Sequence, residues 1–462
     1  MPEIKSIILA AGKGQRMRSV LPKVLHPLCG RPLIDFSIQS AKETGAKQIF
    51  VVVSKSKQDP VALHLKKFAD VKIMRQTAPL GTGHAVMACA AALKNDNGYV
   101  LVTYGDAPLL TAETLKKFIA KTLQENATLG FITANLSMPT GYGRVVRDAM
   151  GDVSKVVEEK EATAEEKKIA ESNMGIYCVQ SGWLFATLKK LKPHPVTKEY
   201  YLTDIVEQAI RGERKVLGFL GTQGEEFFGI NSRKQLSSAA EIMKDRLVDF
   251  WMSRGVTFVD PRHVYLDADV TIGVDSIIHP NVHLLGTTKI GQHSVVECGS
   301  VLKNMTVADG VHIKPYSVLE ESVIEKEAQV GPFARLRPGS HVGAGARVGN
   351  FVELKKTKLG KGVKVNHLTY LGDAAIGDGT NVGCGTITCN YDGAKKYPTK
   401  IGKKVFVGSD VQFVAPVTVG DGAYIAAGST ITDNVPPKAL AIARGKQVNK
   451  KGWIKKRRSL LG

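Results

Sequence analysis

The chain has 462 residues, of which 43% are hydrophobic and 23% charged, and its six cysteines form no CxxC pair, so neither a disulfide framework nor a zinc site is expected. No apolar run approaches the roughly 18 residues that a membrane span requires, and the first residues lack the pattern of a signal peptide, so we expect a cytoplasmic protein without a membrane partner. The formal net charge of +20 suits nucleic acids, but it suits polyanionic small molecules such as nucleotides equally well.

The first half of the chain alternates short apolar runs with helix-like stretches. The runs SIILAA, QIFVVVS and YVLVTYGD are each bounded by Gly, Asp or Ser and are typical of buried parallel strands. Between such runs, TAETLKKFIAKTLQ predicts a helix with Thr111 as its amino-terminal cap. We therefore expect a doubly wound, Rossmann-like α/β domain over residues 1–231, with its ligands at the carboxyl ends of the strands.

Residues 232–252 carry apolar side chains at helical spacing and predict a connecting helix. From residue 253 the period changes to six, and glycines directly follow many of the aliphatic positions. This pattern predicts a β-helix of hexapeptide repeats over residues 253–462. The aliphatic positions are Ile324, Val330, Leu336, Val342, Val348 and Leu354, and later Ile401, Val407, Phe413, Val419, Ile425 and Ile431.

Three polar segments interrupt or follow the repeat. KKTKLGKGVKVNHLTYLGD and TCNYDGAKKYPTK break its register, and we expect both to be loops inserted between coils, where a solenoid usually displays its function. Seven positive charges lie between Lys446 and Arg458, a terminal run that is more often a solvated tail than a binding site.

The string LAAGKGQRM follows the first predicted strand. Gly12 and Gly14 let backbone N–H groups approach a phosphate, and Arg16 and Lys23 add positive charge. The spacing fits neither a Rossmann GxGxxG nor a Walker A motif. Together with LPK at Leu21 to Lys23, the loop resembles the signature of the sugar-phosphate nucleotidylyltransferases, which implies that it holds the triphosphate and that the lysine neutralises developing charge.

YVLVTYGDAPLL delivers Asp106 to the carboxyl end of a buried strand, where a carboxylate suits Mg²⁺. The resemblance adds Asn231 as a second metal ligand, and Gln76, Gly81 and Thr82 as readers of the pyrimidine base. In full, it implies contacts to UTP and the UDP-sugar by Leu9, Ala10, Ala11, Gly12, Gly14, Lys23, Gln76, Gly81, Thr82, Tyr104, Gly105, Asp106, Gly143, Glu158, Asn173, Thr203 and Asn231, with Arg16 and Lys23 as catalytic cations.

In the second half, FARLRPG, NFVELKK, NHLTYLGDAAIGD, GTITCNYDGAKK and AIARG resemble the bacterial family of bifunctional N-acetylglucosamine-1-phosphate uridylyltransferase/glucosamine-1-phosphate N-acetyltransferases. Moving an acetyl group to an amine requires a base, and histidine titrates near neutral pH, so His367 is the candidate. The resemblance covers nearly the whole chain, and we expect only the basic tail after about Arg444 to fall outside it.

This second resemblance implies a left-handed β-helix and a homotrimer whose acetyl site forms between chains. It implies that Glu353 and Asn390 orient the base and the substrate. It assigns the sugar phosphate to Arg337, Lys355 and Lys396, and the lining of that pocket to Tyr370 and Asn381. It assigns acetyl-CoA to Cys384, Asn390, Tyr391, Ser409, Ala427 and Arg444. Gln15, Met174 and Cys384 stand where the family commonly has other residues.

The leading hypothesis is a bifunctional enzyme. Acetyl-CoA would acetylate glucosamine-1-phosphate, and UTP would then couple to N-acetylglucosamine-1-phosphate, with Mg²⁺ as cofactor. A second hypothesis keeps the nucleotidylyltransferase but makes the β-helix a structural or oligomerisation arm, which would have no use for His367, Asn390 and Lys396. A third, a nucleic-acid-binding protein, rests on charge alone, and we expect no nucleic-acid partner because basic and aromatic residues do not interleave.

Overall fold

The computed structural model describes residues 2–12, 14–137, 139–159, 161–222 and 224–458, so the last four residues of the predicted tail lie outside the described part. The chain divides into two compact units, Met1–Met243 and Lys244–Gly462, each with a core of its own. The division falls inside α7 (Arg233–Met252), the helix that covers the predicted connecting segment.

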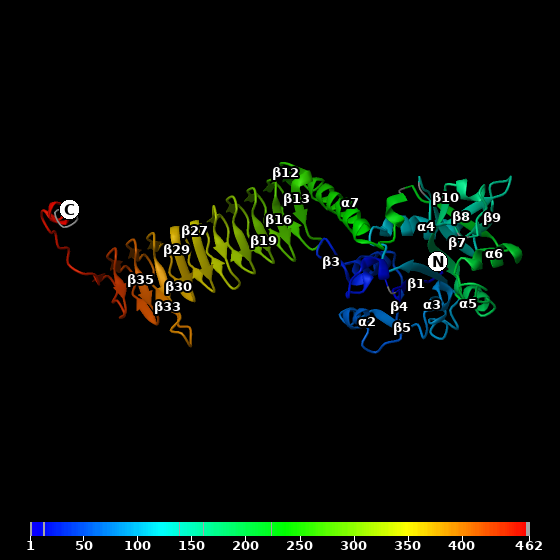
Figure 1. Ribbon diagram of the computed structural model, residues 1–462, viewed down its shortest axis with the longest axis horizontal. Helices are drawn as coiled ribbons and strands as arrows, with labels where there is room; N and C mark the ends of the chain where they lie inside the picture. The colour runs from blue at the N-terminus through cyan, green and yellow to red at the C-terminus, as the bar shows by residue number, and fades with distance from the viewer. Residues whose placement is uncertain (1, 13, 138, 160, 223, 459–462) are drawn as a thin grey trace. The chain divides into compact units, whose positions relative to one another are not determined.

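The first unit is built on a nine-stranded mixed sheet (Figure 1). Its main strand order is β11-β7-β10-β6-β1-β4-β5, and β8 pairs with β10 and β9. The central strand β1 is parallel to both neighbours, whereas β10 is antiparallel to β6 and β7. The bounds are β1 Ile4–Leu9, β4 Gln48–Val53, β5 Val71–Arg75, β6 Tyr99–Tyr104, β7 Leu129–Asn135, β8 Gly143–Arg147, β9 Val153–Val157, β10 Glu171–Gln180 and β11 Val216–Leu220; β2 (Pro27–Leu28) and β3 (Arg31–Pro32) form a separate pair.

Helices cover both faces of this sheet, because successive side chains of a strand point to opposite faces. Ile7 packs in one core with α3, α5 and α6, whereas Ile8 packs in another with α1 and α2. A doubly wound α/β domain is therefore confirmed, and Thr111 caps α4 as predicted, accepting a bond from Thr114 N at 3.2 Å. The helices are α1 Leu33–Glu43, α2 Pro60–Leu65, α3 Thr82–Met87, α4 Ala112–Gln124, α5 Ser181–Leu188 and α6 Asp204–Arg211, with 3₁₀ turns η1 Gln15–Met17, η2 Lys23–Leu25, η3 Glu166–Lys168 and η4 Gly224–Phe227.

The second unit is a parallel β-helix in which short strands of successive coils stack into three faces (Figure 1). It begins with β12 (Thr257–Phe258) and the 3₁₀ turn η5 (Pro261–His263). Face one continues with β15 Ile277–Ile278, β18 Val295–Val296, β21 His312–Ile313, β24 Gln329–Val330, β31 Asn381–Val382, β34 Phe406–Val407, β37 Tyr424–Ile425 and β39 Leu440–Ala441. Face two contains β13 Val264–Leu266, β16 Val282–Leu285, β19 Val301–Lys303, β22 Val318–Glu320, β25 Arg335–Leu336, β32 Ile387–Cys389, β35 Gln412–Val414 and β38 Thr430–Ile431.

Face three is a separate nine-stranded sheet. It contains β14 Thr271–Ile272, β17 Lys289–Ile290, β20 Thr306–Val307, β23 Val323–Ile324, β26 His341–Val342, β28 Lys358–Leu359, β30 Ala374–Ile376, β33 Thr399–Ile401 and β36 Val417–Val419. Two longer strands, β27 (Arg347–Lys355) and β29 (Lys364–Gly372), each pass from face one to face two without a break. These two strands carry much of the second predicted site.

The aliphatic residues predicted at a spacing of six point into the β-helix. All twelve have at most 4% of their surface exposed. They stack coil upon coil, as Ile324 does opposite Val342 and Val407 opposite Ile425. Because such stacked rows form the core, the hexapeptide β-helix is confirmed, and its parallel strands are consistent with the expected left-handed coil.

The first predicted register break is not an inserted loop, so that prediction was wrong. Its residues form β28 and β29, and β29 pairs in register with β27. The sequence pattern shifts because the coil is one residue shorter. Val342 pairs with Leu359, 17 positions on, whereas Ile272 pairs with Ile290, 18 positions on. The polar side chains are accommodated because alternate residues of a strand point outward.

The second break is a loop, as predicted. It leaves β32 after Cys389 and rejoins β33 at Thr399, and an antiparallel bridge joins Tyr391 to Lys396 within it. Beyond the β-helix, residues 442–454 are exposed and the chain continues into α8 (Trp453–Arg458). Within the described ranges, no helix is both long and apolar enough to cross a membrane.

Candidate active sites

The glycine-rich loop lies at the carboxyl edge of the first sheet, beside the end of a neighbouring strand. Parallel β1 and β6 end together at Leu9 and Tyr104, and Gly105 N donates to Leu9 O at 3.0 Å. Gly14 has a φ of +59°, and a Cβ there would lie 2.6 Å from Lys23 Cβ, so only glycine fits. A Cβ at Gly12 would meet nothing within 4 Å, which leaves open space beside the loop backbone.

Lys23, Asp106 and Asn231 converge at this edge although they are distant in the sequence. Lys23 Nζ contacts Asp106 Oδ2 and donates to Asn231 Oδ1 at 2.8 Å. Beside the glycine-rich loop, this cluster borders a cavity of about 290 Å³ that is lined by Gly14, Gln15, Arg16, Lys23 and Asn231. A carboxylate and an amide oxygen that both face a cation form a donor set that suits a hard divalent metal as well as an ammonium group.

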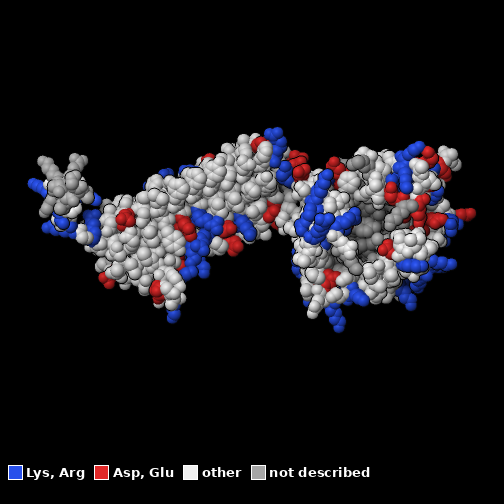
Figure 2. Space-filling model, viewed as in Figure 1, with Lys and Arg blue, Asp and Glu red and all other residues white. Residues whose placement is uncertain are grey.

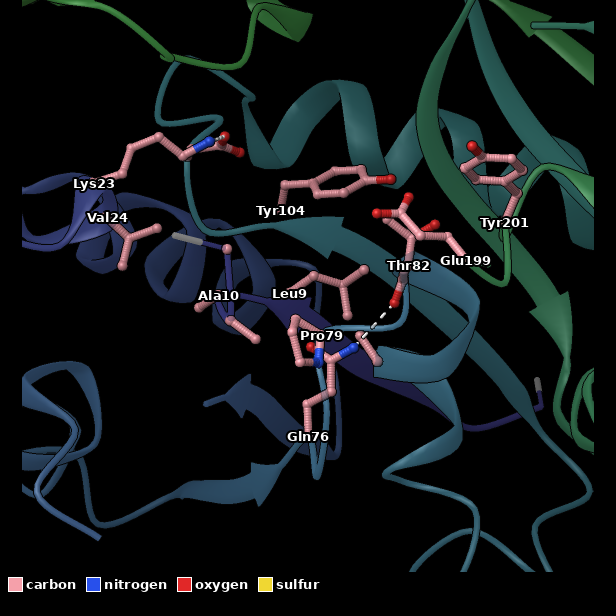
Figure 3. Close-up of a pocket in the computed structure, with 15 residues that line it drawn as sticks. Leu9, Ala10, Lys23, Val24, Gln76, Pro79, Thr82, Tyr104, Glu199 and Tyr201 are labelled. Atoms are coloured by element: carbon pink, nitrogen blue, oxygen red, sulfur yellow. Dashed lines mark hydrogen bonds and ion pairs between the residues drawn. The ribbon is translucent and has the colours of Figure 1, made fainter. Parts of the chain in front are cut away.

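Gln76, Gly81 and Thr82 lie in an adjoining cavity of about 410 Å³ that also contains Leu9, Ala10, Ala11, Gly12, Lys23, Tyr104 and Asp106 (Figure 3). Gln76 Nε2 donates to Gly81 O at 3.1 Å, which fixes the amide and leaves its oxygen to accept a bond. A Cβ at Gly81 would lie 2.6 Å from Tyr200 O, so the backbone at Tyr200 packs against this turn. The residues on either side of Tyr200, Glu199 and Tyr201, line the cavity, and the sequence analysis did not single them out.

A third cavity of about 370 Å³ shares Tyr104 and Asp106 with the second and brings together Gly143, Glu158, Asn173 and Thr203. Thr203 Oγ1 donates to Glu158 Oε1 at 2.9 Å, and Asn173 Oδ1 accepts from Gly175 N at 2.9 Å. Burial first, and then the charges of Asp106 and Glu158, raise the pKa of Tyr104, so its hydroxyl stays protonated. We call the three adjoining cavities the sheet-edge site; every residue of the first predicted set lies in it or, for Gly105, on the strand end beside it.

His367 lies on β29 opposite Asn350 of β27, at the turn from face one to face two. Its Nδ1 is 3.0 Å from Asn350 Oδ1, and because an amide oxygen only accepts, the ring donates from Nδ1 and Nε2 is the nitrogen left to act as a base. Glu353, predicted to orient the base, instead contacts Arg337 Nη1 at 3.1 Å. Sequence reasoning missed Asn350, although its position 17 residues before His367 equals the length of this short coil.

Three cations gather where β27 ends: Lys355 is its last residue, Arg337 directly follows β25, and Lys396 lies on the inserted loop. A hydrogen bond from Lys396, and to a lesser extent burial, lowers the pKa of Lys355, while Asp373 at 3.7 Å opposes this lowering. Arg337 also contributes to the lowering, so three positive groups share one small region. Figure 2 shows Lys and Arg side chains gathered over the coils drawn yellow in Figure 1. Such a cluster suits a phosphate dianion.

Asn390 and Tyr370 complete this region. Asn390 Nδ2 donates to Asp373 Oδ2 at 2.5 Å. A Cβ at Gly372 would lie 2.4 Å from Tyr370 Oη and 2.7 Å from Asn390 Nδ2, so glycine makes room for both side chains. Asp373 was not predicted, and no local pattern marks it, because its role depends on two side chains from other coils.

The remaining predicted residues follow an edge of the β-helix. The corner that carries His367 continues in later coils through Cys384, Ser409, Ala427 and Arg444. Backbone bonds join successive coils there, from Asp410 N to Cys384 O and from Gly428 N to Ser409 O. At the end of this row, Arg444 Nη1 donates to Ala427 O at 2.8 Å. Asn381 lies on β31 of face one, and Tyr391 lies exposed in the inserted loop. We call the cation cluster and this edge the β-helix site.

Comparisons with known proteins agree with both halves. A model of the MobA-like NTP transferase domain matches residues 6–173, and a model of the bacterial transferase hexapeptide (six repeats) matches residues 398–433. "Bifunctional protein GlmU" of Geotalea uraniireducens is 46% identical over 99% of this chain and 100% of its own length. The proteins of that name from Trichlorobacter lovleyi and Brevibacillus brevis are 47% and 44% identical, over 98% and 99% of this chain and 98% of their own lengths.

Similarity over 99% of the chain reaches into the basic carboxyl-terminal segment, so the expectation that the whole tail falls outside the resemblance was wrong. The identity is well above what a shared fold alone requires, and it covers both units and the segment that joins them. The chain therefore belongs to the family of bifunctional GlmU proteins.

Proposed function

We propose that this protein makes UDP-N-acetylglucosamine by two reactions at two sites. The β-helix site transfers an acetyl group from acetyl-CoA to glucosamine-1-phosphate, and the sheet-edge site then couples the product with UTP and releases pyrophosphate. One observation supports the proposal: in a chain of the GlmU family, Lys23, Asp106 and Asn231 converge beside a glycine-rich loop in one unit, and a histidine and a cation cluster lie on two paired strands of the other.

At the sheet-edge site, an oxygen of the sugar phosphate attacks the α-phosphorus of UTP, and the bond from that phosphorus to the bridging oxygen breaks. Arg16, Lys23 and the backbone of Gly12 and Gly14 hold the triphosphate and offset the charge that builds up. The amide oxygen of Gln76 accepts the imide N–H of uracil, since its nitrogen already bonds Gly81 O. Gly143, Glu158, Asn173 and Thr203 hold the sugar hydroxyls and the acetamido group.

Asp106 and Asn231 fit Mg²⁺, because their oxygens already converge on one cationic group. When bound there, Mg²⁺ would neutralise charge on the phosphate oxygens. Lys23 contacts the same two oxygens, and with a metal held there its ammonium group would be available to neutralise charge on the leaving pyrophosphate.

At the β-helix site, the amine of glucosamine-1-phosphate attacks the thioester carbonyl of acetyl-CoA. His367 Nε2 takes the amine proton while Asn350 holds Nδ1–H, and coenzyme A leaves as the thiol. Lys355, Lys396 and Arg337 bind the sugar phosphate; Tyr370, Asn381 and Asn390 line the pocket. Cys384, Tyr391, Ser409, Ala427 and Arg444 follow the acetyl-CoA chain along the edge.

We further propose that the protein is a cytoplasmic homotrimer in which chains share the β-helix site. An exposed aromatic ladder supports this assembly. Tyr316, Phe333 and Phe351 stack at successive corners with centroid separations of 5.5 and 5.4 Å, and each is about half exposed. Leu368, also exposed, occupies the next corner, directly after His367. A large apolar stripe beside a catalytic residue favours burial by a second copy.

The test supplies UTP, Mg²⁺, acetyl-CoA and glucosamine-1-phosphate to the purified protein and follows free thiol and pyrophosphate together. We expect thiol release when acetyl-CoA and glucosamine-1-phosphate are both present. We expect pyrophosphate release only when both reactions can occur or when N-acetylglucosamine-1-phosphate is supplied. Pyrophosphate release without thiol release would favour the β-helix as an oligomerisation arm. Undiminished pyrophosphate release after Mg²⁺ is chelated would reject the metal assignment.

A further inference from the structure

Two segments that are far apart in the sequence hold the metal side of the sheet-edge site. Lys23 begins η2, and Asn231 lies just before α7. Their side chains meet at 2.8 Å. A second hydrogen bond joins the same two segments, from Arg233 Nη1 in the first turn of α7 to His26 Nδ1 at 3.2 Å. Neither His26 nor Arg233 belongs to the set that binds substrate.

His26 is held firmly enough to serve as an anchor. Only 3% of its surface is exposed. Its backbone N–H donates to Lys23 O at 3.2 Å, and its carbonyl accepts from Leu33 N at 3.1 Å, so the backbone of His26 is fixed relative to Lys23 and to the start of α1.

The ring is also in the protonation state that the bond requires. Arginine only donates, so Nδ1 must present its lone pair and the ring proton must be on Nε2. Burial first, and then the charge of Arg233, lower the pKa of His26, while the Leu21 backbone opposes this. The imidazole is therefore neutral at physiological pH and accepts the bond.

On the other side, the turn that carries Asn231 is fixed to α7. Gln235 Oε1 accepts from Asn231 N at 2.8 Å, and Ser232 Oγ accepts from Gln235 N at 3.2 Å. A backbone bond from Ile230 N to Asp106 O at 2.9 Å joins the same turn to the end of β6. Lys23 lies on η2, outside the sheet, and the bond between Arg233 and His26 adds a second connection between η2 and the Asn231 turn beside the contact of Lys23 with Asn231.

We propose that His26 and Arg233 are positioning residues that set the separation of Lys23 and Asn231 for uridylyl transfer. The inference rests on the proposed metal role of Asp106 and Asn231. Small displacements matter here, because a misplacement of about 1 Å in such a site can cost about 10²-fold in rate.

The test uses the full-length protein and four single variants. His26→Leu removes the acceptor, and Arg233→Met removes the donor from an exposed position, where truncation leaves no cavity. His26→Asn retains an acceptor near the position of Nδ1, and Arg233→Lys retains the charge without the planar donor group. Acetyl transfer by the other unit, in the same tube, controls for the amount of intact protein, and thermal unfolding of each variant controls for the folding of the first unit.

We expect His26→Leu and Arg233→Met each to raise the Mg²⁺ concentration for half-maximal pyrophosphate release about 10-fold, with acetyl transfer unchanged. The double variant should be no worse than either single one, because both remove the same bond. His26→Asn should recover most of the loss. In the ligand-free protein, amide hydrogen exchange at residues 231–236 should become faster in the two disruptive variants.

Unchanged Mg²⁺ dependence or unchanged amide hydrogen exchange in His26→Leu and Arg233→Met would overturn the proposal. Fully additive losses of pyrophosphate release in the double variant would also overturn it. Failure of the metal assignment itself would appear separately, as a wild-type rate that does not depend on Mg²⁺. If His26→Leu does not fold, Arg233→Met and Arg233→Lys decide the question, with the larger loss expected for methionine.

Discussion

In the first unit the predicted residues line three adjoining cavities, whereas in the second unit they lie along the outer edge of a β-helix. Tyr104 is partly buried in the sheet-edge site, but His367 is exposed in the β-helix site. The reason is architectural. A doubly wound sheet provides a crevice where its parallel strands end, but a solenoid packs its interior with aliphatic side chains and leaves only its surface for chemistry.

This difference implies different dependence on assembly. A crevice within one chain can exclude water and hold a substrate by itself, so we expect the sheet-edge site to work without a second copy. An exposed edge contacts only one side of a substrate, so we expect the β-helix site to need another surface to complete it. The exposed aromatic ladder, whose last corner lies next to His367, is the part of the chain best suited to pack against that second surface.

The largest expected effect comes from His367→Ala. Loss of the proposed base should lower acetyl transfer by about 10²- to 10⁴-fold, because the imidazole that Asn350 orients would no longer be there to take the amine proton. Pyrophosphate release from UTP and N-acetylglucosamine-1-phosphate should remain within about twofold of wild type. Parallel assays of thiol and pyrophosphate measure this, and equal loss of both activities in a folded variant would contradict the two-site scheme.

Asp106→Ala should produce the opposite result. Without the carboxylate, Lys23 loses its acidic partner and the proposed metal site loses a ligand, so pyrophosphate release should fall by about 10²- to 10³-fold while thiol release persists. The same paired assays apply. Persistence of pyrophosphate release would show that the metal is held elsewhere.

Phe351→Asp tests the dependence on assembly. A carboxylate in the exposed aromatic ladder should oppose association of chains, lowering acetyl transfer by about 10-fold or more at low protein concentration and leaving pyrophosphate release intact. Light scattering and both assays over a dilution series measure the effect. A variant that stays associated and fully active would place the interface on another face; Val274→Asp, at an exposed position outside the ladder, is the matched control.

Asn350→Ala should have a smaller effect on the same reaction. Removing the amide leaves His367 in place but releases its ring, so we expect a loss of about 10-fold in acetyl transfer and an altered pH profile, with Asn350→Asp recovering much of the rate. Steady-state rates between pH 5.5 and 9 would show both changes. An unaltered profile would mean that Glu353, rather than Asn350, governs the base.

The smallest effect concerns stability and pH in the first unit. Burial first, and then the charges of Glu207, Glu158 and Glu161, raise the pKa of Asp204 to about 6. Because the folded pKa exceeds the unfolded value, Asp204 destabilises the fold progressively as pH rises from about 4 through 6. Asp204→Asn should therefore be more stable than wild type at pH 7 and similar at pH 4, with a difference in Tm on the order of 2–4 °C. A difference that does not change with pH would exclude this titration as the cause.

Much of the fold followed from the sequence, since hexapeptide spacing and buried strand runs are local patterns set by which side chains must leave water. The motifs also placed Lys23 and Asp106 at the carboxyl edge of the sheet, because glycine-rich loops and strand ends have a recognisable local chemistry, whereas His367 was expected on a loop and lies on β29. The error lay at KKTKLGKGVKVNHLTYLGD, where polar composition predicted a loop. A coil one residue shorter keeps these residues in a strand and shifts only the pattern.

What the tertiary structure alone decided is which side chains meet. Asn350 faces His367 because two coils stack in one register, and Asn231 reaches Lys23 because a helix end returns to the sheet edge 208 positions later. Such contacts depend on how distant segments pack. The free energy of that packing comes from the buried apolar cores, and these four polar residues are not part of the cores. The sequence therefore determined the chemical groups and their elements, while the packing of those elements determined the pairs through which they act.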